Sequence, residues 1–210
     1  MKKDTKTIIL DAAEDLFAAR GPNGVSLRQI IARAKVNLAA IHYHFGSKES
    51  LLQAVFSRRI VPLNAERIAL LESFEREAGR KAVVLPKVIE ALVAPALRLS
   101  RDPEKGGAKF MRLLGRCFTE PDEKIQAMIT RQVETVGERF MPAFQRALPK
   151  LAPAELMWRL HFLVGAMAHT MADAERLGQY SEGLCDPEDT EGTIRRLVTF
   201  LTAGLKAKVN

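Results

Sequence analysis

The amino-acid sequence predicts an all-α fold, from its hydrophobic periodicity, its helix-capping residues and its lack of strand patterns. Apolar residues recur at three- and four-residue spacing along almost every segment, as on the buried face of a helix. No stretch alternates apolar and polar residues convincingly over six positions, as a half-buried strand would. The 210 residues, 47% hydrophobic and 27% charged, suffice for one large domain or two small ones with a substantial core.

The first two helices have clear boundaries. The first is expected over residues 5–19, and it ends before Gly21, which suits a left-handed cap position. Ser26 and Gln29 form the S-x-x-Q pattern of a capping box, so a second helix is expected to begin directly after Ser26. Ile30 gives this second helix a buried face.

A third and a fourth helix follow closely. Asn37 can cap the third helix, in which Ile41 and Phe45 are four residues apart and therefore point inward together. The glycine after Phe45 ends this helix, and Ser47 can cap the fourth. Pro62 lacks a backbone donor, which predicts a kink or a break in the fourth helix.

The remaining helices are less sharply bounded in the sequence. Proline and polar stretches separate them, and Pro142 should bend the helix that contains it. We expect these helices over residues 86–100, 105–119, 122–147, 154–177 and 188–206.

Residues 26–45 match a helix-turn-helix, in which the second helix lies in the major groove of DNA. If Ile41 faces inward, Ala39 and His42 face outward, where alanine permits close approach and histidine can hydrogen-bond a base edge. The hydroxyl-capped helix start at Ser47 suits a phosphate. The predicted DNA-binding residues are Ser26, Arg28, Lys35, Asn37, Leu38, Ala39, His42, Tyr43, His44, Ser47 and Lys48.

The charge distribution agrees with a polyanionic partner. The net charge of +7 is uneven, because residues 1–60 contain ten Lys/Arg against five Asp/Glu, whereas residues 61–210 contain 22 against 20. A local excess of positive charge favours nucleic acid or an anionic membrane surface. On charge alone, an ordinary solvated basic surface is an equal alternative.

Metal and catalytic functions are not predicted. His42 and His44 project about 200° apart on a helix and cannot share one ion. His161 and His169 could line one helix face, but no acidic residue stands at ligand spacing, and a hydrogen-bonded core histidine is the better interpretation. The sequence contains none of the G-x-S-x-G, G-x-x-x-x-G-K-[ST], H-E-x-x-H or C-x-x-C motifs, so we expect no catalytic residues and no cofactor.

A cytoplasmic location is expected. Two lone cysteines indicate a reducing compartment, not a disulfide scaffold. Acidic residues interrupt any apolar signal segment near the start, and no apolar stretch reaches the roughly 20 residues that span a membrane. We therefore expect no membrane partner.

The stretch SLRQIIARAKVNLAAIHYHFGSKESLL, residues 26–52, resembles the DNA-binding signature of the TetR family of transcriptional regulators. The order and spacing agree: a hydroxyl cap, an Ile-Ala helix, a turn, an aromatic and histidine cluster, and a Lys-Glu helix start. The close resemblance covers residues 5–56. One position departs, because the family commonly has glycine where this chain has Lys35. A left-handed lysine there would cost about 1 kcal/mol, although it could add a phosphate contact.

The resemblance implies two domains: an N-terminal three-helix helix-turn-helix DNA-binding domain over residues 1–56, and a C-terminal helical ligand-binding and dimerisation domain over 57–210. It implies a homodimer on a double-stranded DNA operator, and a small-molecule effector that changes DNA affinity. Bulky side chains in the middle helices predict an apolar pocket formed by Phe110, Leu114, Phe118, Met128, Arg131, Phe144, Trp158, His161 and Phe162.

Two later helices are expected to form the dimer interface. Small residues would let a partner helix approach closely, and the last helix adds an apolar stripe. The predicted interface residues are Gly165, Ala168, Ala172, Leu197 and Leu201. The alternative is that both stripes pack within one chain.

These observations predict a ligand-responsive transcriptional regulator. The expected form is a homodimeric repressor that a small apolar organic effector releases from a pseudo-palindromic operator. Two alternatives remain open: an all-α small-molecule-binding protein or enzyme whose basic N-terminus is incidental, and a DNA-architectural or adaptor protein without a ligand.

Overall fold

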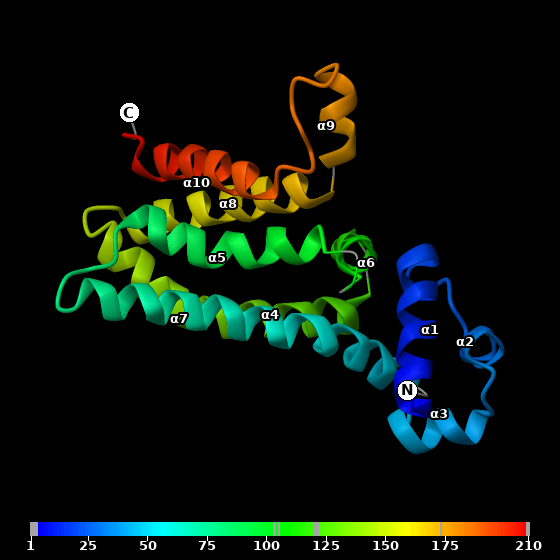
Figure 1. Ribbon diagram of the computed structural model, residues 1–210. Helices are drawn as coiled ribbons and strands as arrows, with labels where there is room; N and C mark the ends of the chain where they lie inside the picture. The colour runs from blue at the N-terminus through cyan, green and yellow to red at the C-terminus, as the bar shows by residue number, and fades with distance from the viewer. Residues whose placement is uncertain (1–3, 103, 105, 120–121, 173, 209–210) are drawn as a thin grey trace. The chain divides into compact units, whose positions relative to one another are not determined.

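The computed structural model is all-α over the residues that it describes, which are 4–102, 104, 106–119, 122–172 and 174–208 (Figure 1). This confirms the predicted fold class. The helices of these residues are α1 (Thr5–Arg20), α2 (Leu27–Ala34), α3 (Leu38–Phe45), α4 (Lys48–Ala78), α5 (Leu85–Ser100), α6 (Gly107–Thr119), α7 (Glu123–Ala147), α8 (Pro153–Ala172), α9 (Ala174–Tyr180) and α10 (Thr190–Lys206).

The chain divides into two compact units. The first comprises Met1–Pro62 and Gly106–Gln132, and the second comprises Leu63–Lys105 and Val133–Asn210. This division extends the first unit beyond the predicted boundary at residue 56 and adds α6 to it, because α6 packs against α1. Helices α4 and α7 each contain residues of both units.

Helix α1 forms the centre of the first unit. Its N-terminus is capped by Asp4, whose carboxylate accepts a 2.6 Å hydrogen bond from the backbone N–H of Thr7. This hydrogen bond lowers the pKa of the Asp4 carboxyl. The apolar side chains buried around α1 come from all five helices of the unit's core: Ile9, Ala13, Phe17, Ile30, Ile41, Leu51, Val55, Phe110 and Leu113.

Helix α5 lies at the centre of the second unit. It contacts α8 and α10 and is buried around nearly its whole circumference, as expected for a helix enclosed by others. One face of α10 packs on it through four buried side chains, Ile194, Leu197, Leu201 and Leu205. At the surface, the Arg98 guanidinium of α5 donates two hydrogen bonds, of 2.7 and 3.0 Å, to the Glu191 carboxylate of α10.

Two of the predicted helices can be compared with the structure at particular residues. Helix α4 does not break at Pro62 but continues from Lys48 to Ala78. Of the helix expected over 154–177, the structure describes α8 (Pro153–Ala172) and α9 (Ala174–Tyr180), and residue 173 lies outside the described residues. Within the described part of the chain, no helix is long and apolar enough to cross a membrane.

Candidate DNA-binding site

The helix-turn-helix forms through the predicted caps. At Ser26 both halves of the capping box are present: its Oγ accepts from the Gln29 N–H at 3.4 Å, and its own N–H donates to Gln29 Oε1 at 2.8 Å. At α3, the Asn37 side-chain oxygen accepts from the Ala40 N–H at 2.9 Å. Lys35, between the two helices, adopts the left-handed conformation with φ 53° and ψ 43°, so the strain expected for a lysine there is present.

The two faces of α3 differ in exposure. Ile41 is completely buried and Phe45 is half-buried, so this face holds α3 on the unit. Tyr43 is 86% exposed on the outer side. The other outer side chains are Leu38, Ala39 and His42, all exposed, while His44 is half-buried.

The imidazole of His42 is oriented by a hydrogen bond to the residue that caps the C-terminus of α3. Its Nδ1 lies 2.9 Å from the carbonyl oxygen of Gly46. Because a carbonyl oxygen can only accept, Nδ1 carries the proton and donates it. In the neutral ring Nε2 is then a bare acceptor, available to a donor outside the protein.

The start of α4 provides a second polar edge beside α3. The Ser47 hydroxyl oxygen accepts a 3.1 Å hydrogen bond from the Ser50 N–H and so caps α4. Lys48, the first residue of α4, is half-buried, whereas Arg28, Lys35 and the two capping residues of α2 and α3 are exposed. Each predicted DNA-binding residue thus lies in or beside the helix-turn-helix, with part of its surface accessible. Their contacts with DNA remain a prediction.

An ion-pair cluster that the sequence analysis missed holds α4 against α1. The buried Glu14 carboxylate accepts from Arg59, with Nε–Oε1 3.0 Å and Nη2–Oε2 3.1 Å, and also from Arg58. Arg58 Nη1 donates in turn to Asp11 Oδ1 at 2.6 Å. The cluster holds α4, the helix that follows α3, against α1. Its only signal in the sequence is a pair of adjacent arginines on the otherwise apolar side of α4.

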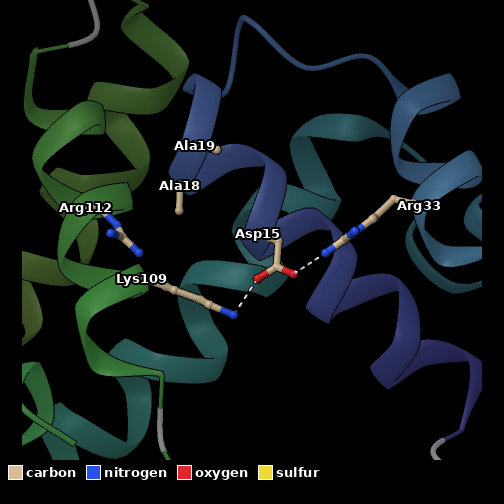
Figure 2. A pocket seen from close by; sticks show the side chains of 6 residues that line it. All are labelled: Asp15, Ala18, Ala19, Arg33, Lys109 and Arg112. Carbon is tan, nitrogen blue, oxygen red and sulfur yellow. Dashed lines mark hydrogen bonds and ion pairs between the residues drawn. The ribbon is translucent and has the colours of Figure 1, made fainter. Parts of the chain in front are cut away.

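A second carboxylate, Asp15, connects three helices of the first unit. It accepts from Arg33 of α2 at 3.4 Å and from Lys109 of α6 at 2.7 Å, as Figure 2 shows. Together with Ala18, Ala19 and Arg112, these residues line a surface hollow of about 560 Å³. Asp15 of α1 therefore contacts both α2 and α6 within the first unit.

The predicted pocket residues are divided between the units. In the first unit Phe110 is fully buried, Leu114 and Met128 are half-buried and Arg131 is exposed; the side chain of Phe118 lies outside the described residues. In the second unit Phe144 is buried. The remaining three, Trp158, His161 and Phe162, are exposed on α8, where Trp158 and His161 line a surface hollow of about 540 Å³ with Ala154 and Met157.

The predicted dimer residues are also divided, between the surface and the core of the second unit. Gly165 is exposed and Ala168 half-buried on α8, whereas Leu197 and Leu201 are buried in contact with their own chain. The side chain of Ala172 lies outside the described residues. The exposed apolar surface of α8 and α10 is instead formed by Met157, Trp158, Phe162, Val164 and Phe200.

No group of three or more potential metal ligands occurs within the part of the chain that the structure describes.

Two family models match this sequence. Residues 9–55 match the one described as bacterial regulatory proteins, tetR family, and residues 90–204 match the one described as the tetracyclin repressor-like C-terminal domain. The second match alone covers more than half of the chain. The chain belongs to the TetR family.

Among TetR-family proteins, the chain is similar to the transcriptional repressor Rv3405c of Mycobacterium tuberculosis, with 48% identity over 94 residues. The match covers 42% of this chain and 48% of that protein, so it spans about half the length of the relative.

Solved structures share the fold at low identity. GusR of Salmonella enterica aligns with a TM-score of 0.64 and 20% identity over 97% of this chain and 96% of its own. FadR of Bacillus subtilis, described in complex with stearoyl-CoA, aligns with a TM-score of 0.64 and 13% identity over 94% of this chain and 98% of its own.

Proposed function

We propose that this TetR-family protein is a DNA-binding transcriptional regulator whose helix α3 enters the major groove. The observation that carries the proposal is the difference between the two faces of α3: Ile41 is completely buried, whereas Tyr43 is 86% exposed. Caps at both Ser26 and Asn37 hold the helices rigidly, as base recognition requires. The excess of Lys/Arg in residues 1–60 supplies attraction to phosphates.

The orientation of His42 leads to a more specific proposal about the operator. With Nδ1 donating to Gly46, the free Nε2 of the neutral ring accepts a hydrogen bond. In the major groove, donors are the N6 amino group of adenine and the N4 amino group of cytosine. We therefore expect an adenine or a cytosine at the position that His42 faces in each half-site.

We also propose that the regulator is a homodimer formed through α8 and α10, which lie side by side in the second unit (Figure 1). Trp158, Phe162 and Phe200 are 61%, 62% and 69% exposed, and large exposed apolar side chains on neighbouring helices favour a protein partner. Gly165 and Ala168 let a second helix approach this surface. Two reading helices related by a dimer axis require a pseudo-palindromic operator.

Control by an effector completes the proposal. Because α4 and α7 each contribute to both units, a ligand that shifts these helices can change the separation of the two α3 helices in a dimer. The Asp15 link between α6 and α2 offers a path within the first unit. A ligand that prefers the mismatched separation would release the operator, since only differential affinity shifts the equilibrium. Repression relieved by a small apolar organic effector is the form we propose.

A mobility-shift experiment tests this function. Purified protein is titrated onto duplex DNA from the region upstream of its own gene, and onto a shuffled duplex of equal length. We expect saturable binding to the first duplex at least about 1,000-fold tighter than to the second. Equal affinity for both would favour an architectural role, and no binding would favour the alternative of a helical small-molecule-binding protein or enzyme.

A further inference from the structure

The second unit contains a buried cation whose partners among the described residues are all uncharged. Arg67, on the part of α4 that belongs to this unit, is 8% exposed. Its Nε donates to the Leu92 carbonyl of α5 at 2.8 Å, and its Nη1 donates to the Asn64 side-chain oxygen at 3.2 Å. Its Nη2 faces the Met167 sulfur of α8 at 3.8 Å. Burial lowers the pKa of Arg67 to about 10, so the guanidinium is still a cation at neutral pH.

Arg159 of the same unit shows how a buried arginine is ordinarily compensated. It is 7% exposed, and its Nε donates to the Glu155 carboxylate at 2.7 Å. Its Nη1 donates to the carbonyl of Leu205 at 2.7 Å, at the negative end of the α10 dipole. Within the described part of the chain, the hydrogen-bond partners of Arg67 include neither a carboxylate nor a helix end.

A buried charge without an opposite charge is unfavourable, and native proteins usually pair such a group. The guanidinium carries five N–H donors in a planar fork that matches a carboxylate through two parallel hydrogen bonds. Three of these donors contact residues that the structure describes, and the weakest of these contacts is the one to Met167. A thioether is a weak acceptor on a flexible side chain, so it can be displaced readily.

We propose that Arg67 anchors the carboxylate of the effector, and that the effector is therefore an organic acid with an apolar body. This inference rests on the proposed function, in which the second unit receives an effector. The carboxylate replaces the Met167 sulfur at Nη2 and supplies the missing opposite charge. The apolar body lies against the buried apolar side chains that α4, α5 and α8 contribute to the second unit, among them Leu71, Leu97 and Leu163. Because the acid pairs a charge that is already buried, a neutral analogue of the same shape binds much more weakly.

The alternative is a purely structural arginine. Pro95 removes one backbone donor from α5, and Arg67 bonds the nearby Leu92 carbonyl. If Arg67 serves only to support this turn of α5, its loss destabilises the protein as the loss of Arg159 does. Carboxylic acids then stabilise the protein no more than their amides do.

The test compares thermal unfolding of the full chain with the variants Arg67→Met, Arg67→Lys and, as a matched buried control, Arg159→Met. Without ligand, we expect the melting temperature of Arg67→Met to equal or exceed that of the wild type, and that of Arg159→Met to fall by about 5 °C or more. The ligands are the straight-chain carboxylates from acetate to palmitate, benzoate, salicylate and phenylacetate, each beside its primary amide.

At least one acid should stabilise the wild type by about 5 °C at saturation, with its amide inert, Arg67→Met unresponsive and Arg67→Lys partly responsive. The proposal is overturned if amides act as well as acids, if Arg67→Met keeps the response, or if no acid stabilises the wild type. Operator binding is measured separately by mobility shift. Acid-specific stabilisation without DNA binding would refute the regulator and keep the anion site, whereas DNA binding without acid-specific stabilisation would do the reverse.

Discussion

The protein exposes aromatic side chains on two surfaces with different surroundings. On α3, the Tyr43 ring contacts His44, and the same short segment contains His42 and, at the start of α4, Lys48. On α8, Trp158 and Phe162 stack with ring centroids 6.0 Å apart beside His161, and Met157 and Val164 of α8 and Phe200 of α10 are also exposed. An exposed aromatic group among donors and cations suits a polyanion, whereas one among methionine, valine and phenylalanine suits another protein surface.

The comparison shows that exposure alone does not identify a partner. A tyrosine hydroxyl at the surface can bond a phosphate and keep its water contacts when free, so it is stable in the unbound protein. Trp158 and Phe162 leave apolar area in water, which is unfavourable until something covers it. Charge substitutions on the two surfaces are therefore expected to have different effects.

The largest effect is expected from charges placed on the α8 surface. The double variant Trp158→Glu, Phe162→Glu should raise the dimer dissociation constant at least about 100-fold, because two carboxylates would have to be desolvated in the interface. Sedimentation velocity measures the change, and circular dichroism checks the fold. Leu184→Glu, at an exposed apolar residue of the loop after α9, is the matched control and should remain dimeric. A double variant that stays dimeric would remove this surface from the proposed interface.

The next effect concerns base recognition by α3. His42→Ala should reduce discrimination at one operator position by roughly 1–3 kcal/mol while leaving affinity for random DNA nearly unchanged. Selection of bound sequences from a random library shows which position loses its preference, and we expect adenine or cytosine there. Equal losses on specific and random DNA would show that His42 contacts the backbone.

A smaller effect is expected at Lys35, where substitutions separate its role in DNA binding from the effect of its backbone strain on the stability of the protein. Lys35→Asn and Lys35→Gly both relieve the left-handed strain, since asparagine and glycine tolerate positive φ. We expect each to raise the free energy of unfolding by about 0.5–1 kcal/mol, measured by urea denaturation. If Lys35 contacts phosphate, both variants also bind DNA a few-fold more weakly, whereas unchanged DNA affinity would leave Lys35 without that role.

The smallest effect is expected from the ion pairs between α4 and α7 in the second unit. Hydrogen bonds from Arg139, and the nearby charge of Arg146, lower the pKa of Glu75 below its ordinary value. The stability that this carboxylate contributes is therefore present above pH about 4.5 and is lost as the pH falls through its lowered pKa. Glu75→Gln should lose less stability than the wild type between pH 5 and pH 3, by up to about 1 kcal/mol. Identical acid titrations of both proteins would contradict this.

Local signals explain how much of the fold was predictable. The caps at Ser26 and Asn37 bond backbone groups three residues away, so the sequence itself contains both partners. The buried and exposed faces of α3 could also be predicted, because their residues belong to the same short segment. Of the kink or break expected at Pro62, a break does not occur, because proline removes only one hydrogen bond, and buried residues on both sides, such as Ile60 and Leu63, hold the helix together.

Long-range contacts explain what could not be predicted. Glu14 and Arg59 are 45 residues apart, and nothing local pairs them. Helix α8 carries apolar residues on several sides, and the sequence does not say which side faces its own chain. Trp158 and Phe162, predicted for a pocket, are exposed on α8, where Trp158 lines a surface hollow. Leu197 and Leu201, predicted for the dimer interface, are buried against their own chain.

The most direct test of DNA reading by α3 uses the two tyrosines of the chain, Tyr43 on α3 and Tyr180 on α9, both largely exposed. Fluorescence anisotropy with a selected operator duplex gives the affinity of Tyr43→Ala, Tyr180→Ala and the wild type over a range of salt concentrations. We expect Tyr43→Ala to bind about 10-fold more weakly to every duplex, and Tyr180→Ala to match the wild type within two-fold. Equal affinities for all three proteins would contradict the claim that the outer face of α3 lies against DNA.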